Sequence, residues 1–242
     1  MARHVLVTGG ATGIGRATAA RFALDGDRVW ITGRRAGPLA QTAAELGTQV
    51  SAVVCDATDP DQLTQLADVL PGRLDVLVNN AGGNTDMRRD AAPTDLHAVA
   101  AGWRANLDAN LLSAVLTTSA VRNRLAAGGA VISIGSIGAE RGAGSYGPTK
   151  AALASWNIGL SAELGPAGVT ANVVSPGYIA DTEFFRGRLT AQRRDALIGA
   201  THNGRAGTPD DVTGMIVFLA SPDARHVTGQ VLAVNGGAHP TR

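Results

Sequence analysis

Seven short, nearly continuous apolar runs alternate with alanine-rich helical stretches along this chain of 242 residues. Strands that are apolar along their whole length, rather than at every second residue, are buried on both faces, as in parallel sheets covered by helices. Crossovers between such strands are right-handed. The pattern therefore predicts an α/β fold with a doubly wound, seven-stranded parallel sheet and helices on both faces. The expected strands are residues 4–8, 28–32, 50–55, 74–78, 130–134, 169–174 and 230–234.

Composition narrows the possible classes of function. Because no Pro-rich or Gly/Ser-rich linker and no internal repeat divides the chain, residues 1–242 are expected to form a single domain. Basic and acidic residues nearly balance, at 21 against 20, which disfavours nucleic-acid binding. The sequence shows no apolar stretch long enough for a signal peptide or a membrane span, so a cytoplasmic protein without membrane attachment is expected. The five histidines lie far apart and predict no metal site.

A glycine-rich turn lies between the first expected strand and the first helix. It reads Thr8-Gly9-Gly10-Ala11-Thr12-Gly13-Ile14-Gly15-Arg16. Glycines there allow positive φ and close approach of an anion, while the start of the helix adds unpaired N–H groups and a favourable dipole. This position in a βαβ unit favours the pyrophosphate of a dinucleotide over a purely structural turn. The candidate cofactor-binding residues are Gly9, Thr12, Gly13, Ile14 and Gly15.

The end of the second strand indicates which dinucleotide binds. The segment Thr32-Gly33-Arg34-Arg35 lacks the carboxylate that would hold the ribose hydroxyls of NAD. Arg34 is suited to bind a 2′-phosphate through charge-assisted hydrogen bonds, so NADP(H) is favoured over NAD(H). The alternative is a pair of solvated loop arginines. After the third strand, Asp56 and its neighbour Ala57 are candidates for the adenine end, although Asp56 is alternatively a carboxylate that begins a helix.

The only lysine of the chain, Lys150, follows Tyr146 by four residues, whereas the other 20 basic residues are arginines. On a helix this spacing puts both side chains on one face, where an ammonium favours the ionised form of a phenol. A tyrosine tuned in this way donates or accepts a proton near neutral pH. The alternative is a surface tyrosine and lysine that are neighbours without a shared role.

Together these motifs resemble the short-chain dehydrogenase/reductase family along essentially the whole chain. The glycine-rich turn resembles the family's cofactor turn, and Tyr146-Gly147-Pro148-Thr149-Lys150 is similar to its catalytic segment. Further segments that resemble family motifs are Asn79-Asn80-Ala81-Gly82, Ser175-Pro176-Gly177, Val227-Thr228-Gly229-Gln230 and Asn235-Gly236-Gly237. The resemblance implies a Rossmann-type fold and an NAD(P)-dependent oxidoreductase, similar to 3-oxoacyl-(acyl-carrier-protein) reductases.

The resemblance also implies roles for individual residues. Tyr146 is the general acid of carbonyl reduction, or the base in the reverse direction, and Lys150 binds the nicotinamide ribose and lowers the tyrosine pKa. Asn110, seven residues after Trp103, holds a water in a proton relay with Lys150. Asn106 does not match this spacing, so we expect it to cap a helix or lie at the surface. The remaining cofactor-binding residues implied are Asn80, Ala81, Gly82, Pro176, Gly177, Ile179 and Thr182.

Two serines compete for the position beside the tyrosine. The family's usual spacing of thirteen residues selects Ser133, whereas the local sequence at the end of the strand resembles the family at Ser136, ten residues before Tyr146. We choose Ser136 as the catalytic serine. The choice requires a three-residue deletion within 139–145 and leaves Ser133 as a strand hydroxyl bonded to nearby backbone.

Residues 178–205 are expected to form a lid over the substrate. This segment carries Phe184, Phe185 and four arginines, at 186, 188, 193 and 194. The arginines suit an acidic carrier or an anionic acyl substrate, but a solvated amphipathic helix with inward phenylalanines is the other interpretation.

The expected activity is NADPH-dependent reduction of a ketone to a secondary alcohol, on a small carbonyl compound or a carrier-bound acyl chain. The alternatives are an NAD-dependent alcohol dehydrogenase that works in the oxidative direction, and a catalytically silent cofactor-binding regulator. Helices at 111–125 and after Lys150 have apolar residues on more than one face. By resemblance, they imply a homotetramer or homodimer.

Overall fold

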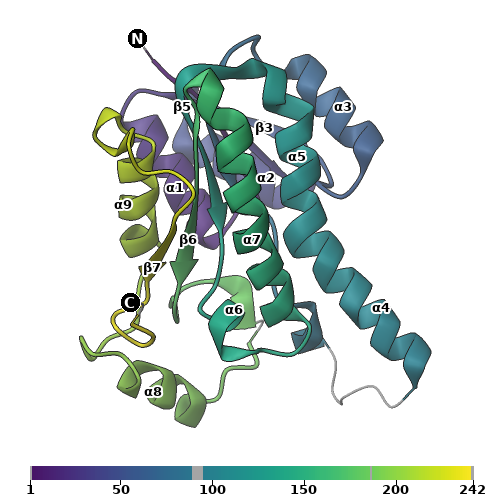
Figure 1. Ribbon diagram of the computed structural model, residues 1–242, viewed down its shortest axis with the longest axis vertical. Coiled ribbons are helices and arrows are strands. Elements are labelled where there is room, and N and C mark those ends of the chain that lie inside the picture. The colour runs from purple at the N-terminus through teal and green to yellow at the C-terminus, as the bar shows by residue number, and fades with distance from the viewer. Residues whose placement is uncertain (1, 89–94, 186, 241–242) are drawn as a thin grey trace.

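The computed structural model describes residues 2–88, 95–185 and 187–240. Its centre is one seven-stranded parallel sheet in the order β3-β2-β1-β4-β5-β6-β7 (Figure 1). The predicted doubly wound fold is confirmed, because the strand order reverses between β1 and β4. The strands are β1 His4–Thr8, β2 Arg28–Gly33, β3 Val50–Val54, β4 Leu74–Asn79, β5 Leu125–Ile134, β6 Thr170–Pro176 and β7 Val231–Val234.

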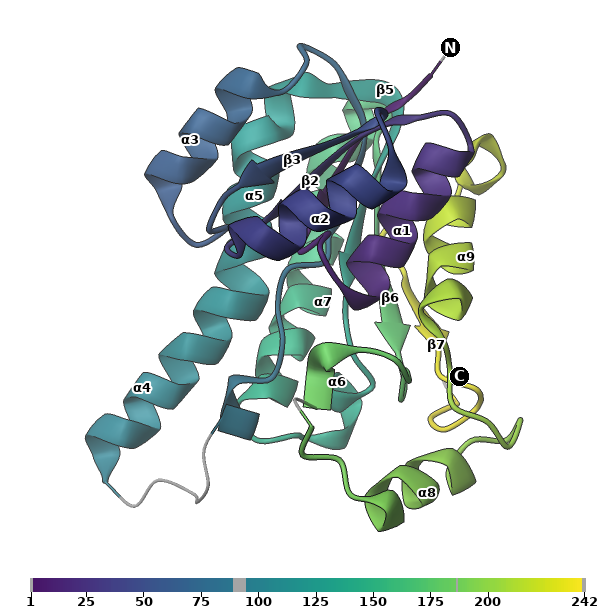
Figure 2. The ribbon, with the colours of Figure 1, turned by 180° about the vertical axis from the view of Figure 1, so that it is seen from behind.

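Helices cover both faces of the sheet. Phe22, Leu39 and Ile216 belong to the apolar core on the face covered by α1, α2 and α9, whereas Leu66 and Leu160 belong to the core beneath α3, α5 and α7 (Figures 1 and 2). The helices are α1 Gly13–Leu24, α2 Ala36–Leu46, α3 Pro60–Val69, α4 Leu96–Leu107, α5 Ser113–Val121, α6 Gly138–Arg141, α7 Tyr146–Leu164, α8 Ala191–Gly199 and α9 Pro209–Leu219. None of the helices in the described ranges is both long and apolar enough to cross a lipid bilayer.

The helix expected at 111–125 differs from the observed one at both ends. A π-helical turn, Asp108–Leu112, joins α4 to α5, so the helix begins much earlier, and it ends at Val121. Leu125 is instead the first residue of β5, where it pairs with Leu74 of β4. Apolar residues that face several directions look alike in a buried helix and a buried strand, which is why periodicity misplaced this boundary.

Hydrogen bonds join the carboxyl ends of β1 and β4, where the strand order reverses. The Thr8 hydroxyl accepts from the backbone N–H groups of Asn80 and Ala81, each at 3.0 Å. In return, the Asn80 side chain donates to the carbonyl oxygens of Thr8 and Gly9, at 2.9 and 3.0 Å. The glycine-rich turn is therefore fixed against the loop that follows β4.

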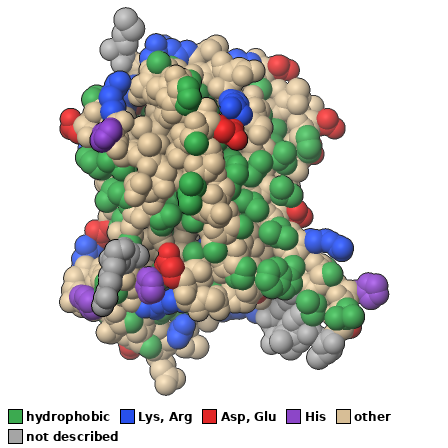
Figure 3. Space-filling model, in the orientation of Figure 1, with side chains coloured by type: hydrophobic (Ala, Val, Ile, Leu, Met, Phe, Trp, Pro, Cys, Tyr) green, Lys and Arg blue, Asp and Glu red, His purple; other side chains and the backbone are tan. Residues whose placement is uncertain are grey.

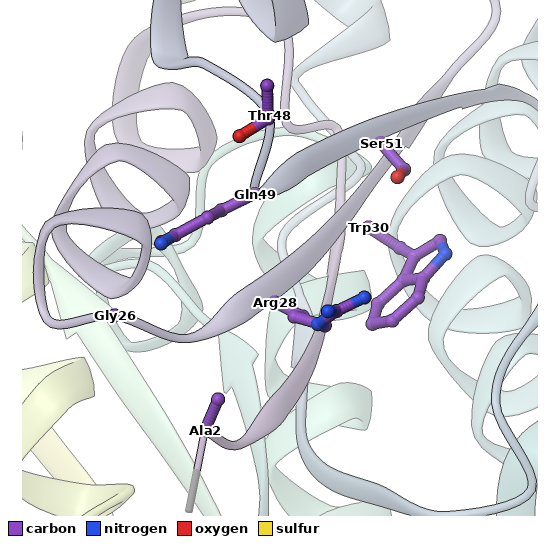
Figure 4. Close-up of a pocket in the computed structure, with 7 residues that line it drawn as sticks. All are labelled: Ala2, Gly26, Arg28, Trp30, Thr48, Gln49 and Ser51. Atoms are coloured by element: carbon purple, nitrogen blue, oxygen red, sulfur yellow. The ribbon is translucent and has the colours of Figure 1, made fainter.

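A hollow of about 530 Å³ opens at the opposite edge of the sheet, beside the amino ends of β2 and β3 (Figure 4). It is lined by Ala2, Gly26, Arg28, Trp30, Thr48, Gln49 and Ser51. None of the candidate site residues contributes to it. In open α/β sheets ligands bind at the carboxyl ends of the strands, so the functional site belongs to the other edge.

Thr8→Val is expected to destabilise the fold while keeping the side-chain shape. Two N–H groups lose their acceptor, and an unsatisfied buried donor costs roughly 1–3 kcal/mol. Urea unfolding at fixed protein concentration measures the loss. The matched control is Thr117→Val, since the buried Thr117 hydroxyl only donates to the Ser113 carbonyl, at 2.7 Å. Equal losses in the two variants would contradict the importance of the Thr8 contacts.

Candidate active site

The glycine-rich turn needs its glycines for steric reasons. Gly9 and Gly13 have φ of 64° and 52°, a region that favours glycine. A Cβ atom on Gly15 would lie 2.3 Å from the Gly9 carbonyl oxygen and 2.5 Å from Asn80 Nδ2. A side chain at Gly15 would therefore collide with the backbone of the same turn.

The start of α1, like that of α2, has no side-chain cap. Thr12 makes no side-chain hydrogen bond to α1, and the first turn contains no acidic residue. By contrast, Asp59, Asp95 and Thr208 each accept backbone N–H groups at the starts of α3, α4 and α9. The first N–H groups of α1 thus have no side-chain cap, which fits the pyrophosphate of a dinucleotide.

A groove of about 440 Å³ runs between this turn and the segment after β6. It is lined by Ala11, Thr12, Gly13, Arg16, Ala17, Asp181, Thr182, Glu183, Pro209 and Asp210. A Cβ atom on Gly13 would lie 3.4 Å from the Thr182 side chain, so the start of the expected lid touches the turn. Thr12 and Gly13, at the uncapped start of α1, line this groove, which fits the pyrophosphate of a bound NAD(P).

The structure brings together the residues predicted for the adenosine end. Arg34 Nη1 lies 3.9 Å from Asp56 Oδ2, and the Arg34 side chain is 66% exposed. Arg35 forms an ion pair of 2.7 Å with Glu183 of the lid segment. The alternative in which Asp56 begins a helix is wrong, because Asp59 caps α3 and Asp56 Oδ1 accepts from Thr58.

Of the two competing serines, Ser136 lies against Tyr146. Its side chain hydrogen-bonds the phenol, and its hydroxyl also accepts from the Gly138 N–H at 3.0 Å. Ser133 is fully buried within β5, and its hydroxyl accepts from the Asn79 side chain at 3.5 Å. The backbone partner expected for Ser133 is thus replaced by a side chain of the neighbouring strand.

Tyr146 and Lys150 lie in the first turns of α7 and are both buried. Burial raises the pKa of Tyr146 to about 12, although the Ser136 hydrogen bond acts in the opposite direction. Lys150 Nζ lies 5.8 Å from the Tyr146 ring centre and donates to the Ile134 carbonyl oxygen at 2.7 Å. The net pKa of Tyr146 in the chain alone is raised because desolvation of the phenolate outweighs the Ser136 hydrogen bond. The effect of Lys150 on this pKa stays a prediction.

Asn110 lies in the π-helical turn between α4 and α5. Its Oδ1 accepts from the Gly83 N–H at 2.9 Å, and its Nδ2 donates to the carbonyl oxygens of Gly83 and Asn106, both at 3.0 Å. A Cβ atom on Gly82 would lie 2.7 Å from Asn110 Oδ1, so this loop also needs its glycine. Single π turns occur often at functional sites, and this one presents Asn110 to the loop that follows β4.

Asn106 is fully buried, so its expected place at a cap or on the surface is wrong. Its Nδ2 donates to Asp86 Oδ1 at 3.0 Å and to Ser145 Oγ at 2.7 Å. Sequence reasoning also missed Asp86. For Asn106 a signal was available: its spacing of four residues from Asn110 puts two polar side chains on one face of a largely apolar helix.

The lid segment begins close to the candidate catalytic residues. Ile179 is buried, and its neighbour Ala180 donates to the Gly207 carbonyl oxygen at 2.8 Å. Phe184 packs its ring edge-on to Tyr146, with ring centres 5.7 Å apart. Of the four lid arginines, Arg186 lies outside the described residues. At Pro176 β6 ends, and the Gly177 N–H donates to the Val234 carbonyl oxygen at 3.0 Å.

Comparison with known proteins agrees with this geometry. Residues 9–239 match the family model described as enoyl-(acyl carrier protein) reductase. L-rhamnose 1-dehydrogenase (NAD(P)(+)) of Azotobacter vinelandii is 40% identical over 252 residues, covering 97% of this chain and 96% of that protein. The 3-oxoacyl-[acyl-carrier-protein] reductase MabA of Mycobacterium tuberculosis is 36% identical over 251 residues, covering 98% and 93%.

Among solved structures, a short chain dehydrogenase from Burkholderia cenocepacia in complex with NADP has a TM-score of 0.84 and 34% identity, covering 98% of both chains. The fold and site define an NAD(P)-dependent oxidoreductase acting on the CH–OH/C=O pair. The chain belongs to the short-chain dehydrogenase/reductase family.

Lys150→Met is expected to raise the melting temperature at pH 7. Burial lowers the Lys150 pKa from 10.5 to about 8, so its ammonium costs the fold roughly 3 kcal/mol there. Above pH 8 the folded chain releases this proton, whereas the unfolded chain keeps it until about pH 10.5. The parent therefore gains stability over this interval, and its difference from the variant narrows.

Thermal unfolding between pH 7 and 10.5 measures this difference. Arg122→Met, which removes an exposed cation paired with Glu163, is the control whose difference from the parent stays nearly constant. A constant difference for Lys150→Met as well would contradict the assigned cost of burying Lys150.

Proposed function

We propose that this protein reduces a ketone to a secondary alcohol by direct hydride transfer from NADPH, with Tyr146 as the general acid. When bound, NADPH supplies the hydride to the carbonyl carbon and becomes NADP⁺. The observation that carries the proposal is the hydrogen-bonded pair of Ser136 and Tyr146, with Lys150 one helical turn further on.

Tyr146 donates its phenolic proton to the carbonyl oxygen as that oxygen gains charge. A pKa of about 12 keeps the phenol protonated at neutral pH, which is the form that reduction requires. The Ser136 hydroxyl lies beside the phenol and provides a second hydrogen bond to the same oxygen. Catalysis is then a matter of positioning and of stabilising developing charge.

Lys150 has two assigned tasks in this proposal. Its ammonium binds the nicotinamide ribose, and it stabilises the phenolate that remains after Tyr146 has given up its proton. Asn110 holds a water that returns a proton to this pair. The remaining chain binds the cofactor through Gly9, Thr12, Gly13, Ile14, Gly15, Asp56, Ala57, Asn80, Ala81, Gly82, Pro176, Gly177, Ile179 and Thr182.

NADP(H) is the proposed cofactor because of Arg34. Its side chain is largely exposed beside Asp56 at the end of β2, and the neighbouring Arg35 is already paired with Glu183. Arg34 is therefore the cation placed to bind a 2′-phosphate. The NADP complex of the Burkholderia cenocepacia relative supports this assignment.

The comparisons favour two substrate classes that a panel can separate. MabA is a 3-oxoacyl-[acyl-carrier-protein] reductase, which supports a β-keto acyl substrate, whereas L-rhamnose 1-dehydrogenase supports the oxidative alternative. A panel of ketones, β-keto acyl thioesters, secondary alcohols and L-rhamnose, each with both cofactors, tests the direction. Faster oxidation with NAD than reduction with NADPH would replace the proposal by its alternative.

We also propose a homotetramer or homodimer formed through α5 and α7. Hydrophobic side chains gather on this face of the molecule (Figure 3). Leu112 at the end of the π turn and Ile158 of α7 are 42% and 62% exposed. Light scattering on the purified chain tests the assembly.

Tyr146→Phe is expected to lower kcat by roughly 10²–10⁴-fold, because it removes a general acid and keeps the ring. NADPH binding, measured by fluorescence titration, stays within about twofold of the parent, since the ring remains in place. The only other tyrosine, Tyr178, packs against Phe185 with ring centres 5.7 Å apart. Tyr178→Phe is the matched control and retains most of the turnover; parental turnover in Tyr146→Phe would overturn the mechanism.

Arg34→Gln is expected to change the cofactor preference. Hydrogen bonds to charged groups contribute about 1.5–3 kcal/mol, so kcat/KM with NADPH falls by about tenfold to a hundredfold. The value with NADH changes little, because NADH lacks the 2′-phosphate. Arg21→Gln, which removes an arginine paired with Asp25 on α1, is the control with unchanged preference. A parent protein that prefers NADH would contradict the assignment of Arg34 as the residue that binds the 2′-phosphate.

A further inference from the structure

We infer that Asp86 and Asn106 are positioning residues that fix the first turn of α7 and, through it, the Tyr146 phenol. Both act through Tyr146. The kinetic part of this inference rests on the proposed function, but the structural part does not.

The Asp86 carboxylate caps α7 from a distant segment of the chain. Its Oδ2 accepts from the backbone N–H groups of Ser145 and Tyr146, at 2.9 and 3.3 Å. Its Oδ1 accepts from the Ser145 hydroxyl at 2.8 Å and from Asn106 Nδ2 at 3.0 Å. Ser145 occupies the N-cap position but makes no capping hydrogen bond of its own. The cap that helix starts normally receive from the adjacent residue is therefore supplied by Asp86.

The local backbone is shaped to admit this carboxylate. Gly144 has a φ of 55°, and a Cβ atom on it would lie 2.7 Å from Asp86 Oδ2. A negative charge at a helix N-terminus is also favoured by the helix dipole. The approach of Asp86 to α7 thus depends on Gly144.

Asn106 connects this cap to the candidate relay residue. Its Nδ2 donates to Asp86 and Ser145, while its Oδ1 accepts from the Thr85 N–H at 3.1 Å and from Asn110 Nδ2 at 3.3 Å. One buried amide therefore fixes the loop after β4, the π turn and the start of α7 relative to one another. A displacement at Asp86 reaches both Tyr146 and Asn110 through this amide.

The Asp86 side chain accepts all four of these hydrogen bonds, so residue 86 needs acceptor atoms at every contact. Replacing Asp86 by Asn puts an NH₂ group where one oxygen accepted, so donor faces donor at one or more contacts. The helix start is then free to shift, and a misplacement of about 1 Å at a reacting group costs about a hundredfold in rate. Asp86→Asn keeps the size of the side chain, so the defect is one of hydrogen bonding.

The test compares Asp86→Asn with Asp95→Asn, which alters a cap of the same kind at the start of α4. Amide hydrogen exchange, which needs no substrate, is expected to become at least about tenfold faster at Ser145 and Tyr146 only in Asp86→Asn. In the same variant, kcat falls by about tenfold to a hundredfold, whereas the NADPH dissociation constant stays within about twofold. Asp95→Asn keeps the parental kcat.

Parental exchange rates at Ser145 and Tyr146 in Asp86→Asn, or a parental kcat in that variant, would overturn the inference. If Asp86→Asn does not fold, Ser145→Ala gives the test, because it removes one donor and keeps both backbone contacts. It is expected to lower kcat by about threefold to tenfold with unchanged cofactor binding, and a parental kcat would overturn the inference. Absence of turnover in the parent, with the expected exchange rates, counts against the proposed function alone.

Discussion

The hydrogen bonds between the ends of β1 and β4 hold the candidate site in register. Thr8 and Asn80 exchange contacts at the point where the strand order reverses, so the glycine-rich turn and the loop after β4 are fixed as one unit. Asn110 then binds that loop from the other side through Gly83. Ligand sites in open α/β sheets lie at this reversal, because the loops on either side diverge there.

Two helices, α1 and α7, begin in this region, and only one of them has a side-chain cap. α1 begins without a side-chain cap and offers its N–H groups to an anion, whereas α7 begins under the carboxylate of Asp86. The first arrangement suits a ligand that comes and goes, and the second fixes a group that must stay in place. Burying the Lys150 ammonium costs stability at neutral pH, and Tyr146 is buried beside it.

The sheet could be predicted from the sequence because strands buried on both faces carry a continuous apolar signal. The helix end near Leu125 could not, since a buried helix and a buried strand share that signal. Local sequence at the end of β5 favoured Ser136 over Ser133, and Ser136 is the serine that lies beside Tyr146. Its catalytic role stays a prediction. Asp86 was missed because it contacts Ser145, 59 residues further along the chain, and no local pattern encodes that contact. The raised pKa of Tyr146 could not be predicted, because spacing reports a neighbouring ammonium but not the burial that opposes ionisation.

The proposed chemistry is direct hydride transfer from NADPH to a carbonyl carbon beside Tyr146. The most direct measurement uses NADPH that carries deuterium at C4 of the nicotinamide, prepared separately as each of its two epimers, with a ketone that the protein reduces. Mass spectrometry of the alcohol product locates the label. We predict one deuterium on the carbinol carbon from one epimer and none from the other. An alcohol without deuterium from either epimer, its new C–H hydrogen drawn from solvent, would contradict direct transfer.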